Sequence, residues 1–304
     1  MSNLLTVGIA GFAAAFVDGA LGMGFGPTSS SILLASGISP AGVSATVNIA
    51  KVATGFVGGA SHWRFGNIDK RLVYRLAIPG VFGALLGTFI LTNVDGKQMR
   101  PILAAVLIVI GLRILMRFRK PIQSSTSQTI TKEQTRGVEI AGAAGGVTNG
   151  LIGAWGPVVT PFLLHRGVLP RIVVGSVNTA EVAVAFVAAG SLLTSNKTGV
   201  DLGTVSAMLI GGVIAAPVAA WSVRFVPARA LGLAVSFLLL FTNVRELAGW
   251  QHLGYSRWFA YAAVTILLVV AAVNPHIAQR RSGATSPATD ALSAINLTAT
   301  PNPN

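Results

Sequence analysis

The chain is 304 residues long, with 52% hydrophobic residues, only 10% charged residues and a mean hydropathy of +0.69. Such an apolar composition indicates a membrane protein and not a soluble domain. The formal net charge of +13 would suggest nucleic acid in a soluble protein, but here Lys and Arg lie in short loops between apolar segments, so no nucleic-acid partner is expected. The chain has no cysteine and four histidines without ligand spacing, so we expect no disulfide framework, metal or cofactor.

The first apolar stretch in chain order, Leu4–Ser36, is too long for a single membrane span. Glycines and a Gly-Pro pair interrupt it between Asp18 and Pro27, which predicts a hairpin that returns to its own side of the membrane. Such irregular backbone survives at membrane depth only if it is buried in protein or lines a wet cavity. Single spans are predicted next at Ala41–Ala60, Val73–Thr92 and Pro101–Phe118.

The second half of the chain follows the same order. Another long apolar stretch, Val138–Leu164, is interrupted between Thr148 and Pro157 and predicts a second hairpin. The spans expected after it are Arg171–Thr194, Gly203–Trp221, Arg229–Val244 and Trp258–Val273. We therefore divide the chain into a first transmembrane repeat (1–118), a basic cytoplasmic linker (119–137), a second transmembrane repeat (138–248), a C-terminal transmembrane helix (249–278) and a disordered tail (279–304).

The two halves are also related in sequence. Asp18–Ser61 aligns with Thr148–Ser191 at an offset of 130 residues without a gap, and 16 of the 44 aligned positions are identical. A repeat built from glycine-interrupted apolar segments is typical of transporters whose binding site lies between the halves near the bilayer midplane. Each repeat has three full crossings, so the second repeat starts on the opposite face of the membrane. The sequence therefore predicts inverted repeats.

Loop charges predict the orientation. The loop His62–Arg75 and the linker Arg113–Arg136 are rich in Lys and Arg and are expected in the cytoplasm, whereas Asn93–Arg100 is shorter, less basic and expected outside. No Lys or Arg precedes Lys51, so the N-terminus is expected outside and no signal peptide is predicted. The C-terminus, beside Arg280, is expected in the cytoplasm, and the membrane is expected to be a bacterial plasma membrane.

One pair of ionisable residues occupies corresponding positions within the predicted spans. Lys51 lies in the middle of Ala41–Ala60, Glu181 is its repeat counterpart, and Asn48 and Asn178 precede them by three positions, on the same helix faces. A charge at the bilayer centre costs several kcal/mol unless it is paired or hydrated, which favours a functional role. We expect Asn48, Lys51 and Asn178 to bind an anion, and Glu181 to carry a coupling proton or to compete for Lys51 when the site is empty. The alternative is a permanent Lys51–Glu181 ion pair that locks the repeats together.

The two interruptions offer backbone donors for the same anion. Helix N-termini at a break point N–H groups inward with a partial positive charge, and glycines let the backbone approach a ligand closely. The candidate binding residues are Gly24, Gly26, Gly153, Gly156, Thr148 and Asn149, with nearby hydroxyls at Thr28, Ser29, Ser30, Ser31 and Thr160. The alternative is that Gly and Ser pack the helices tightly, which is favoured for any single glycine but less so for clusters at symmetric positions.

Asp18 is a third ionisable candidate, placed just before the first interruption. Its position favours a role as the cap of the half-helix that follows. The alternative is a role in proton or cation coupling. Phe25 and Trp155, beside the two Gly-Pro pairs, either gate a pocket or fill it, and aromatic residues at such places more often fill it.

These elements resemble the TauE/SafE sulfite exporter family. The resemblance rests on the breaks that end in Gly26-Pro27 and Gly156-Pro157, on the Gly-x-x-Pro elements Gly37–Pro40 and Gly167–Pro170, and on the polar spans that follow them. It covers roughly residues 5–270. The resemblance implies transport of sulfite or of another small sulfur-containing or organic anion.

The fold predicted from these observations is an all-α polytopic membrane protein with two inverted repeats, and the predicted function is alternating-access transport of a small anion, with proton coupling as one option. A membrane enzyme is disfavoured because the spans carry almost no ionisable residues beyond Asp18, Lys51 and Glu181. A passive anion channel and a cation-coupled importer of an organosulfonate or organic acid share the same features and stay open as alternatives. The expected partners are the anion and membrane lipid, and a homo-oligomer also stays open.

Overall fold

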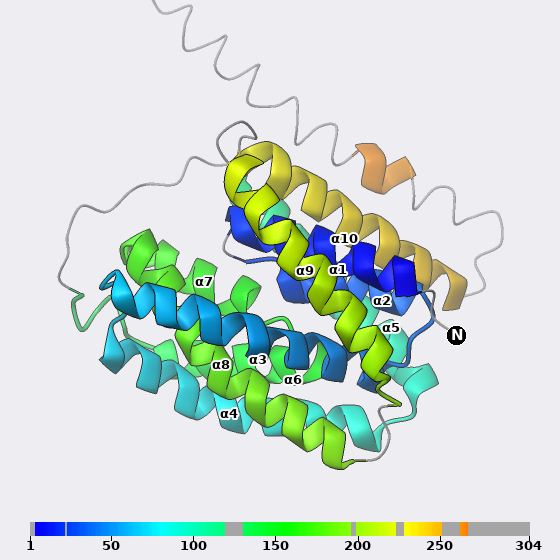
Figure 1. The fold of residues 1–304 in the computed structure, drawn as a ribbon, viewed down its shortest axis with the longest axis horizontal. Helices are drawn as coiled ribbons and strands as arrows, with labels where there is room; N and C mark the ends of the chain where they lie inside the picture. Colours follow the sequence, from blue (N-terminus) through cyan, green and yellow to red (C-terminus); the bar gives the residue numbers. More distant parts are fainter. Residues whose placement is uncertain are drawn as a thin grey trace, which may run out of the picture.

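The computed structural model describes residues 4–21, 23–118, 130–195, 199–222, 228–250 and 262–266. In these residues the regular secondary structure is entirely helical, as the sequence predicts (Figure 1). The first half contains α1 (Leu4–Leu21), α2 (Phe25–Ala35), α3 (Pro40–Arg64), α4 (Lys70–Asn93) and α5 (Gly96–Phe118). The second half contains α6 (Val138–Ile152), α7 (Gly156–His165), α8 (Pro170–Thr194), α9 (Leu202–Ser222) and α10 (Ala228–Trp250).

Each of the two long apolar stretches forms a broken helix where the glycines predict a break. α1 ends at Leu21 and α2 begins at Phe25, while α6 ends at Ile152 and α7 begins at Gly156. Gly153, between α6 and α7, has a φ of +66°, a conformation that glycine adopts without steric cost. The positions of both interruptions are therefore confirmed.

The predicted single spans from Ala41–Ala60 to Arg229–Val244 lie within α3, α4, α5, α8, α9 and α10. The last predicted span, Trp258–Val273, lies outside the described residues apart from 262–266, as do residues 119–129 of the linker and the predicted tail. By length and composition, four of the described helices can cross a membrane: α4, α5, α8 and the Gly232–Gly249 part of α10. Shorter apolar helical segments occur in α1 and α9.

Large aromatic side chains cover part of the outer surface of the helices. Phe56 on α3, Phe82 and Phe89 on α4, and Phe186 on α8 are between 63% and 68% exposed. Phe56 and Phe186 are repeat counterparts, so the two halves present the same residue at equivalent places. Exposed apolar side chains in this number fit a surrounding of lipid and not of water.

The helices form two groups, visible in Figure 1. α4 of the first half packs along α6 of the second half, and α9 of the second half packs along α1 of the first half. α3 and α8 pack on each other, α8 also packs on α4, α6 and α7, and α3 also touches α2 and α5. We call α3, α4, α6, α7 and α8 the α6 group. α5 and α10 pack on each other, α10 also packs on α1 and α2, and α5 also touches α2, α3 and α7. We call α1, α2, α5, α9 and α10 the α1 group.

Glycines bring the helix backbones close together. A Cβ at Gly146 of α6 would collide with the carbonyl of Gly80 of α4, and one at Gly211 of α9 would collide with the carbonyl of Gly8 of α1. Close backbone contact at small residues is typical of helix packing in membranes. The two interruptions are also in contact with each other, because a Cβ at Gly26 would collide with the carbonyl of Gly153. The interruptions therefore lie where the two groups meet.

Candidate functional site

Lys51 of α3 and Glu181 of α8, the ionisable repeat counterparts, meet in the structure. The Lys51 ammonium forms an ion pair with a Glu181 carboxylate oxygen, and the two side chains are only 8% and 16% exposed. Two charges are tolerated in so dry a place because each neutralises the other, and removing one partner of such a pair typically costs about 3–5 kcal/mol. The predicted contact is confirmed, while its role in transport stays a prediction.

Asp18, near the end of α1, lies beside this pair. Its Oδ1 accepts a hydrogen bond from the backbone N–H of Phe25, the first residue of α2, at 3.3 Å. Gly24 and not Asp18 is the N-cap residue of α2, but Asp18 accepts from the first N–H of the half-helix, as a cap would. Asp18 also interacts electrostatically with both Lys51 and Glu181. The site thus contains one cation and two carboxylates, and a coupling role for Asp18 stays a prediction.

Asn48 of α3 is fully occupied by contacts within the protein. Its Nδ2 donates to the carbonyl of Asn149 at 3.1 Å and to the carbonyl of Ser44 at 2.9 Å, and its Oδ1 accepts from Asn149 Nδ2 at 2.7 Å. Ser44 Oγ donates to the carbonyl of Gly150 at 2.7 Å. The last turn of a helix leaves carbonyl groups without partners inside the helix. Asn48 and Ser44 bind these carbonyls at the end of α6, which stabilises the second interruption.

Asn178 of α8, the repeat counterpart of Asn48, has a different environment. It is half-buried, and within the described part of the chain no hydrogen bond to its side chain is found. Its amide lies on the face of α8 that carries Glu181, one turn away. An amide has two N–H donors and one acceptor oxygen, so Asn178 can bind a ligand without breaking a contact of the protein.

The predicted hydroxyl donors differ in the same way. Ser30 Oγ donates to the carbonyl of Ile152, and Thr148 Oγ1 donates to the carbonyl of Ala154 at 2.8 Å. Thr28 Oγ1 of α2 and Thr160 Oγ1 of α7 are buried and have no hydrogen-bond partner among the described residues. Because a buried hydroxyl without a partner is costly, Thr28 and Thr160 are the hydroxyls best placed to serve a ligand or an ordered water.

The glycines of the interruptions make close backbone contacts. Gly26 lies against Gly153, and a Cβ at Gly156 would stand 3.3 Å from the Cβ of Met23. A Cβ at Gly24 would collide with Val17 of α1. These contacts support the packing role that the sequence favours for single glycines, and the backbone cradle for an anion stays a prediction.

Trp155, beside the second Gly-Pro pair, is fully buried. Its indole Nε1 donates to the carbonyl of Val177 at 3.2 Å, and its ring lies against Gly145 of α6. Phe25, at the corresponding place in the first repeat, is also buried. Both aromatic residues therefore fill space in this structure, as the sequence favours.

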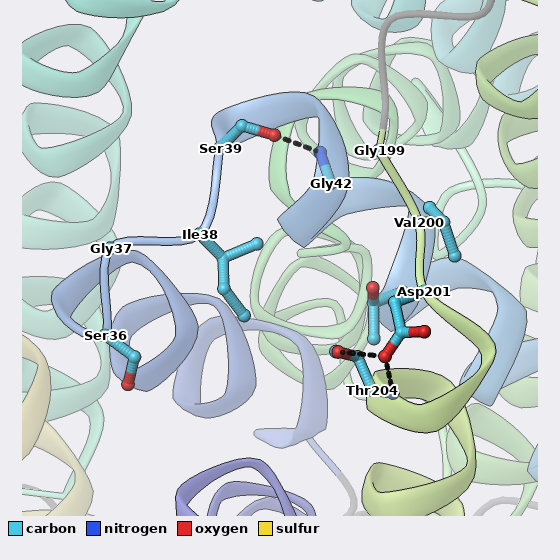
Figure 2. A pocket seen from close by; sticks show the side chains of 10 residues that line it. Ser36, Gly37, Ile38, Ser39, Gly42, Gly199, Val200, Asp201 and Thr204 are labelled. Carbon is cyan, nitrogen blue, oxygen red and sulfur yellow. Dashed lines mark hydrogen bonds between the residues drawn. The ribbon is translucent and has the colours of Figure 1, made fainter. Parts of the chain in front are cut away.

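A pocket of about 330 Å³ opens where the loop before α3 meets the start of α9 (Figure 2). It is lined by Ser36, Gly37, Ile38, Ser39, Gly42, Thr46, Gly199, Val200, Asp201 and Thr204. Hydrogen bonds from the backbone N–H groups of Thr204 and Gly203 lower the pKa of Asp201, so its carboxylate is ionised at neutral pH. Sequence reasoning missed this pocket. Its signal was the pair of helix caps: Ser39 and Asp201 each accept a hydrogen bond from the backbone N–H three residues later.

The basic segments that the sequence assigns to one side of the membrane meet at a second pocket of about 490 Å³. It is lined by Arg71, Arg75, Lys132, Glu133, Thr135, Arg136 and Gly137. Arg75 forms an ion pair with Glu139 at 2.6 Å and donates to Thr135 Oγ1 at 2.8 Å. The loop before α4 and the linker before α6 therefore lie at the same end of the helices.

Comparison with known proteins agrees with this arrangement. The family model described as "Sulfite exporter TauE/SafE" matches residues 7–246. The chain is 38% identical over 276 residues to a protein of Bacillus subtilis (strain 168) named "Probable membrane transporter protein YtnM", covering 89% of each chain. No solved structure matches the chain. The protein therefore belongs to the TauE/SafE sulfite exporter family and is a multi-pass membrane transporter.

Proposed function

We propose that the protein is a secondary transporter that moves a small anion across the plasma membrane by alternating access, with sulfite or a related sulfur-containing or organic anion as its substrate and protons as its coupling ion. The observation that carries this proposal is the buried Lys51–Glu181 pair, which joins equivalent positions of the two halves. Ionisable groups at membrane depth are rare and typically mark substrate or proton pathways.

Inverted repeats are part of the proposal. The helix order supports them, since a broken helix followed by three long helices occurs in both halves. The contacts support them as well: α1 and α6 are equivalent, α4 and α9 are equivalent, and the α4–α6 contact has its counterpart in the α9–α1 contact. The pairs α3–α8 and α5–α10 are then each their own counterpart, which places Lys51 and Glu181 near the pseudo-two-fold axis.

The orientation follows from the basic pocket. The Lys and Arg of the loop before α4 and of the linker gather at one end of the helices, which we assign to the cytoplasm. The pocket lined by Ser39, Asp201 and Thr204 belongs to the opposite side, because α3 and α8 each cross between the two sets of loops. On this assignment the N-terminus lies outside.

The anion binds at Lys51 when a proton neutralises a carboxylate. With all three groups ionised, Asp18, Lys51 and Glu181 carry charges of −1, +1 and −1, a sum of −1, which repels an anion. A proton on Glu181 brings the sum to zero and releases the Lys51 ammonium, and two opposite unit charges at 4 Å then attract by about 4 kcal/mol at an effective dielectric constant of 20. Asn178, Thr28 and Thr160 supply donors that the protein itself does not use.

Sulfite flux into proteoliposomes, with and without an imposed proton gradient, tests the proposal. We expect saturable sulfite flux that follows the gradient. If the site prefers reduced sulfur anions, thiosulfate and a sulfonate should inhibit this flux more strongly than sulfate does. Flux that does not saturate would identify a passive channel. Flux that follows a sodium gradient and ignores the proton gradient would identify the cation-coupled importer.

A further inference from the structure

The start of α4 is hydrogen-bonded to α8 and packed against it at the end that we assign to the cytoplasm. Asp69 caps α4, because its Oδ1 accepts a hydrogen bond from Leu72 N–H at 2.8 Å. The backbone N–H of Asp69 donates to Ser176 Oγ of α8 at 2.9 Å. The carbonyl of Asn67 packs on Gly175, where a Cβ would collide with it. The first turn of α4 and the residues before it are therefore in direct contact with this part of α8.

The equivalent place in the other half is open. Asp201 caps α9 as Asp69 caps α4, because its Oδ2 accepts from Thr204 N–H at 2.9 Å. Thr46 of α3 is the counterpart of Ser176, since 46 plus 130 is 176. Both Asp201 and Thr46 line the 330 Å³ pocket (Figure 2 draws its lining side chains). Thr46 is only 1% exposed, and no described residue forms a hydrogen bond with it.

The packing of whole helices shows the same difference. α4 packs broadly along α8, whereas its counterpart α9 touches α3 at few places. α3 and α8 cross in opposite directions, since Gly55 contacts Val182 while Gly59 lies next to Thr179. Thr46 and Ser176 therefore lie towards opposite sides of the membrane. Each precedes a residue of the central ion pair by five positions, or about 7.5 Å along its helix.

We propose that Asp69–Ser176 and Asp201–Thr46 are the two gates of the transport pathway, and that this structure is the state with the Asp201–Thr46 gate open to the outside. The pocket is the outer vestibule, with room for a small hydrated anion. In the opposite state α9 closes on α3, the N–H of Asp201 donates to Thr46 Oγ, and Asp69 releases Ser176. This inference rests on the proposed alternating-access function and adds the residues that open and close the pathway.

Cysteine labelling tests the gates directly, because the natural chain has no cysteine. Thr46→Cys and Ser176→Cys are prepared as single variants and treated with a membrane-impermeant maleimide in right-side-out and inside-out vesicles. The controls are Gln98→Cys and Arg166→Cys, which are exposed at the two ends and line neither gate; Gln98 lies near the start of α3, because a Cβ at Gly96 would stand 3.8 Å from Pro40. We expect Thr46→Cys to react from outside and Ser176→Cys to be protected. A change of pH or substrate gradient that accelerates one should slow the other, while both controls stay constant.

A second variant tests the gate through one hydrogen bond. Ser176→Ala removes the acceptor of the Asp69 N–H and leaves the α4 cap in place. A net hydrogen bond corresponds to about three- to tenfold in an equilibrium constant, so labelling of Thr46→Cys should slow by about that factor in the Ser176→Ala background. Thr194→Ala serves as the control and should leave the rate unchanged, because Thr194 is exposed at the other end of α8 and its hydroxyl binds only carbonyls of its own helix.

The outcomes distinguish a failure of the proposed gates from a failure of the proposed substrate. Reciprocal labelling without sulfite flux supports the gates and overturns the substrate part of the proposed function. Sulfite flux with labelling rates of Thr46→Cys and Ser176→Cys that rise and fall together, or that ignore Ser176→Ala, overturns the gates. Labelling of Gln98→Cys from the cytoplasmic side alone would reverse the assignment of the open side.

Discussion

The central turns of α3 and α8 are equivalent in the repeat and differ in what they contact. On α3, Asn48 is held by Asn149 and Ser44 and fixes the end of α6. On α8, no described residue forms a hydrogen bond with Asn178, which lies one turn from Glu181. The ion pair of Lys51 with Glu181 joins the two helices between these environments. The comparison shows that equivalent residues of a repeat can have different surroundings, because one asparagine holds the end of α6 and the other has no hydrogen bond among the described residues.

The largest effect is expected from breaking the ion pair. Lys51→Ala and Glu181→Gln each leave a buried partner unpaired, so each should reduce stability by about 3–5 kcal/mol and abolish coupled transport. The double variant Lys51→Met/Glu181→Met removes both charges and should recover most of the melting temperature without recovering flux. Thermal unfolding in detergent and flux in proteoliposomes measure the two effects. A double variant that is both stable and active would show that the pair is purely structural.

The next effect separates the two asparagines. Asn48→Ala leaves the buried side-chain amide of Asn149 without its acceptor and should lower the free energy of unfolding by about 1–3 kcal/mol. Asn178→Ala removes no side-chain hydrogen bond among the described residues, so its stability should stay within about 0.5 kcal/mol of wild type while its apparent KM for the anion rises. Thermal unfolding and concentration-dependent flux would distinguish them. The opposite pattern would reverse the roles assigned to α3 and α8.

Helix packing in the α6 group can be tested at one glycine. Gly146→Ala places a methyl group against the carbonyl of Gly80, and overpacking of this kind typically costs about 1–3 kcal/mol. Gly190→Ala is the matched control, because a Cβ there meets no atom within 4 Å. We expect the first variant to melt at lower temperature and the second to melt like wild type. Equal melting temperatures would contradict the close α4–α6 contact.

The smallest effect is expected at Trp155. Trp155→Phe keeps an aromatic ring and removes the hydrogen bond from Nε1 to the carbonyl of Val177, which should cost about 1 kcal/mol. Because Trp155 fills space in this structure, the maximal flux per folded protein should not change. A large change in flux with unchanged stability would favour the gating role that the sequence left open.

Sequence patterns predicted the features that depend on local residue types or on equivalent positions in the two repeats. The interruptions follow from glycines and Gly-Pro pairs, and the meeting of Lys51 with Glu181 follows from their equivalent positions. The sequence did not predict the contact of Asn48 with Asn149, because it joins positions that are not repeat counterparts. Nor did it predict the open pocket beside Thr46 or the closed contact at Ser176. Two similar repeats suggest a symmetric molecule, and the broad α4–α8 contact, against the narrow α9–α3 contact, breaks that symmetry.

The glycines at the interruptions illustrate a further limit. A backbone cradle for an anion and a close contact between two backbones both need a residue without a Cβ. Glycine at positions 26 and 153 is therefore compatible with both roles. In this structure the two residues contact each other. The distinction depends on which backbone lies opposite, and that is decided by tertiary packing.

The most direct test of the central claim is the pH dependence of sulfite flux in wild type and in Glu181→Gln, measured in proteoliposomes with equal amounts of folded protein. If Glu181 carries the coupling proton, wild-type flux follows an imposed proton gradient and the residual flux of Glu181→Gln is independent of it, because Gln cannot take up or release a proton. A Glu181→Gln variant that transports sulfite with the wild-type response to the gradient would contradict the account.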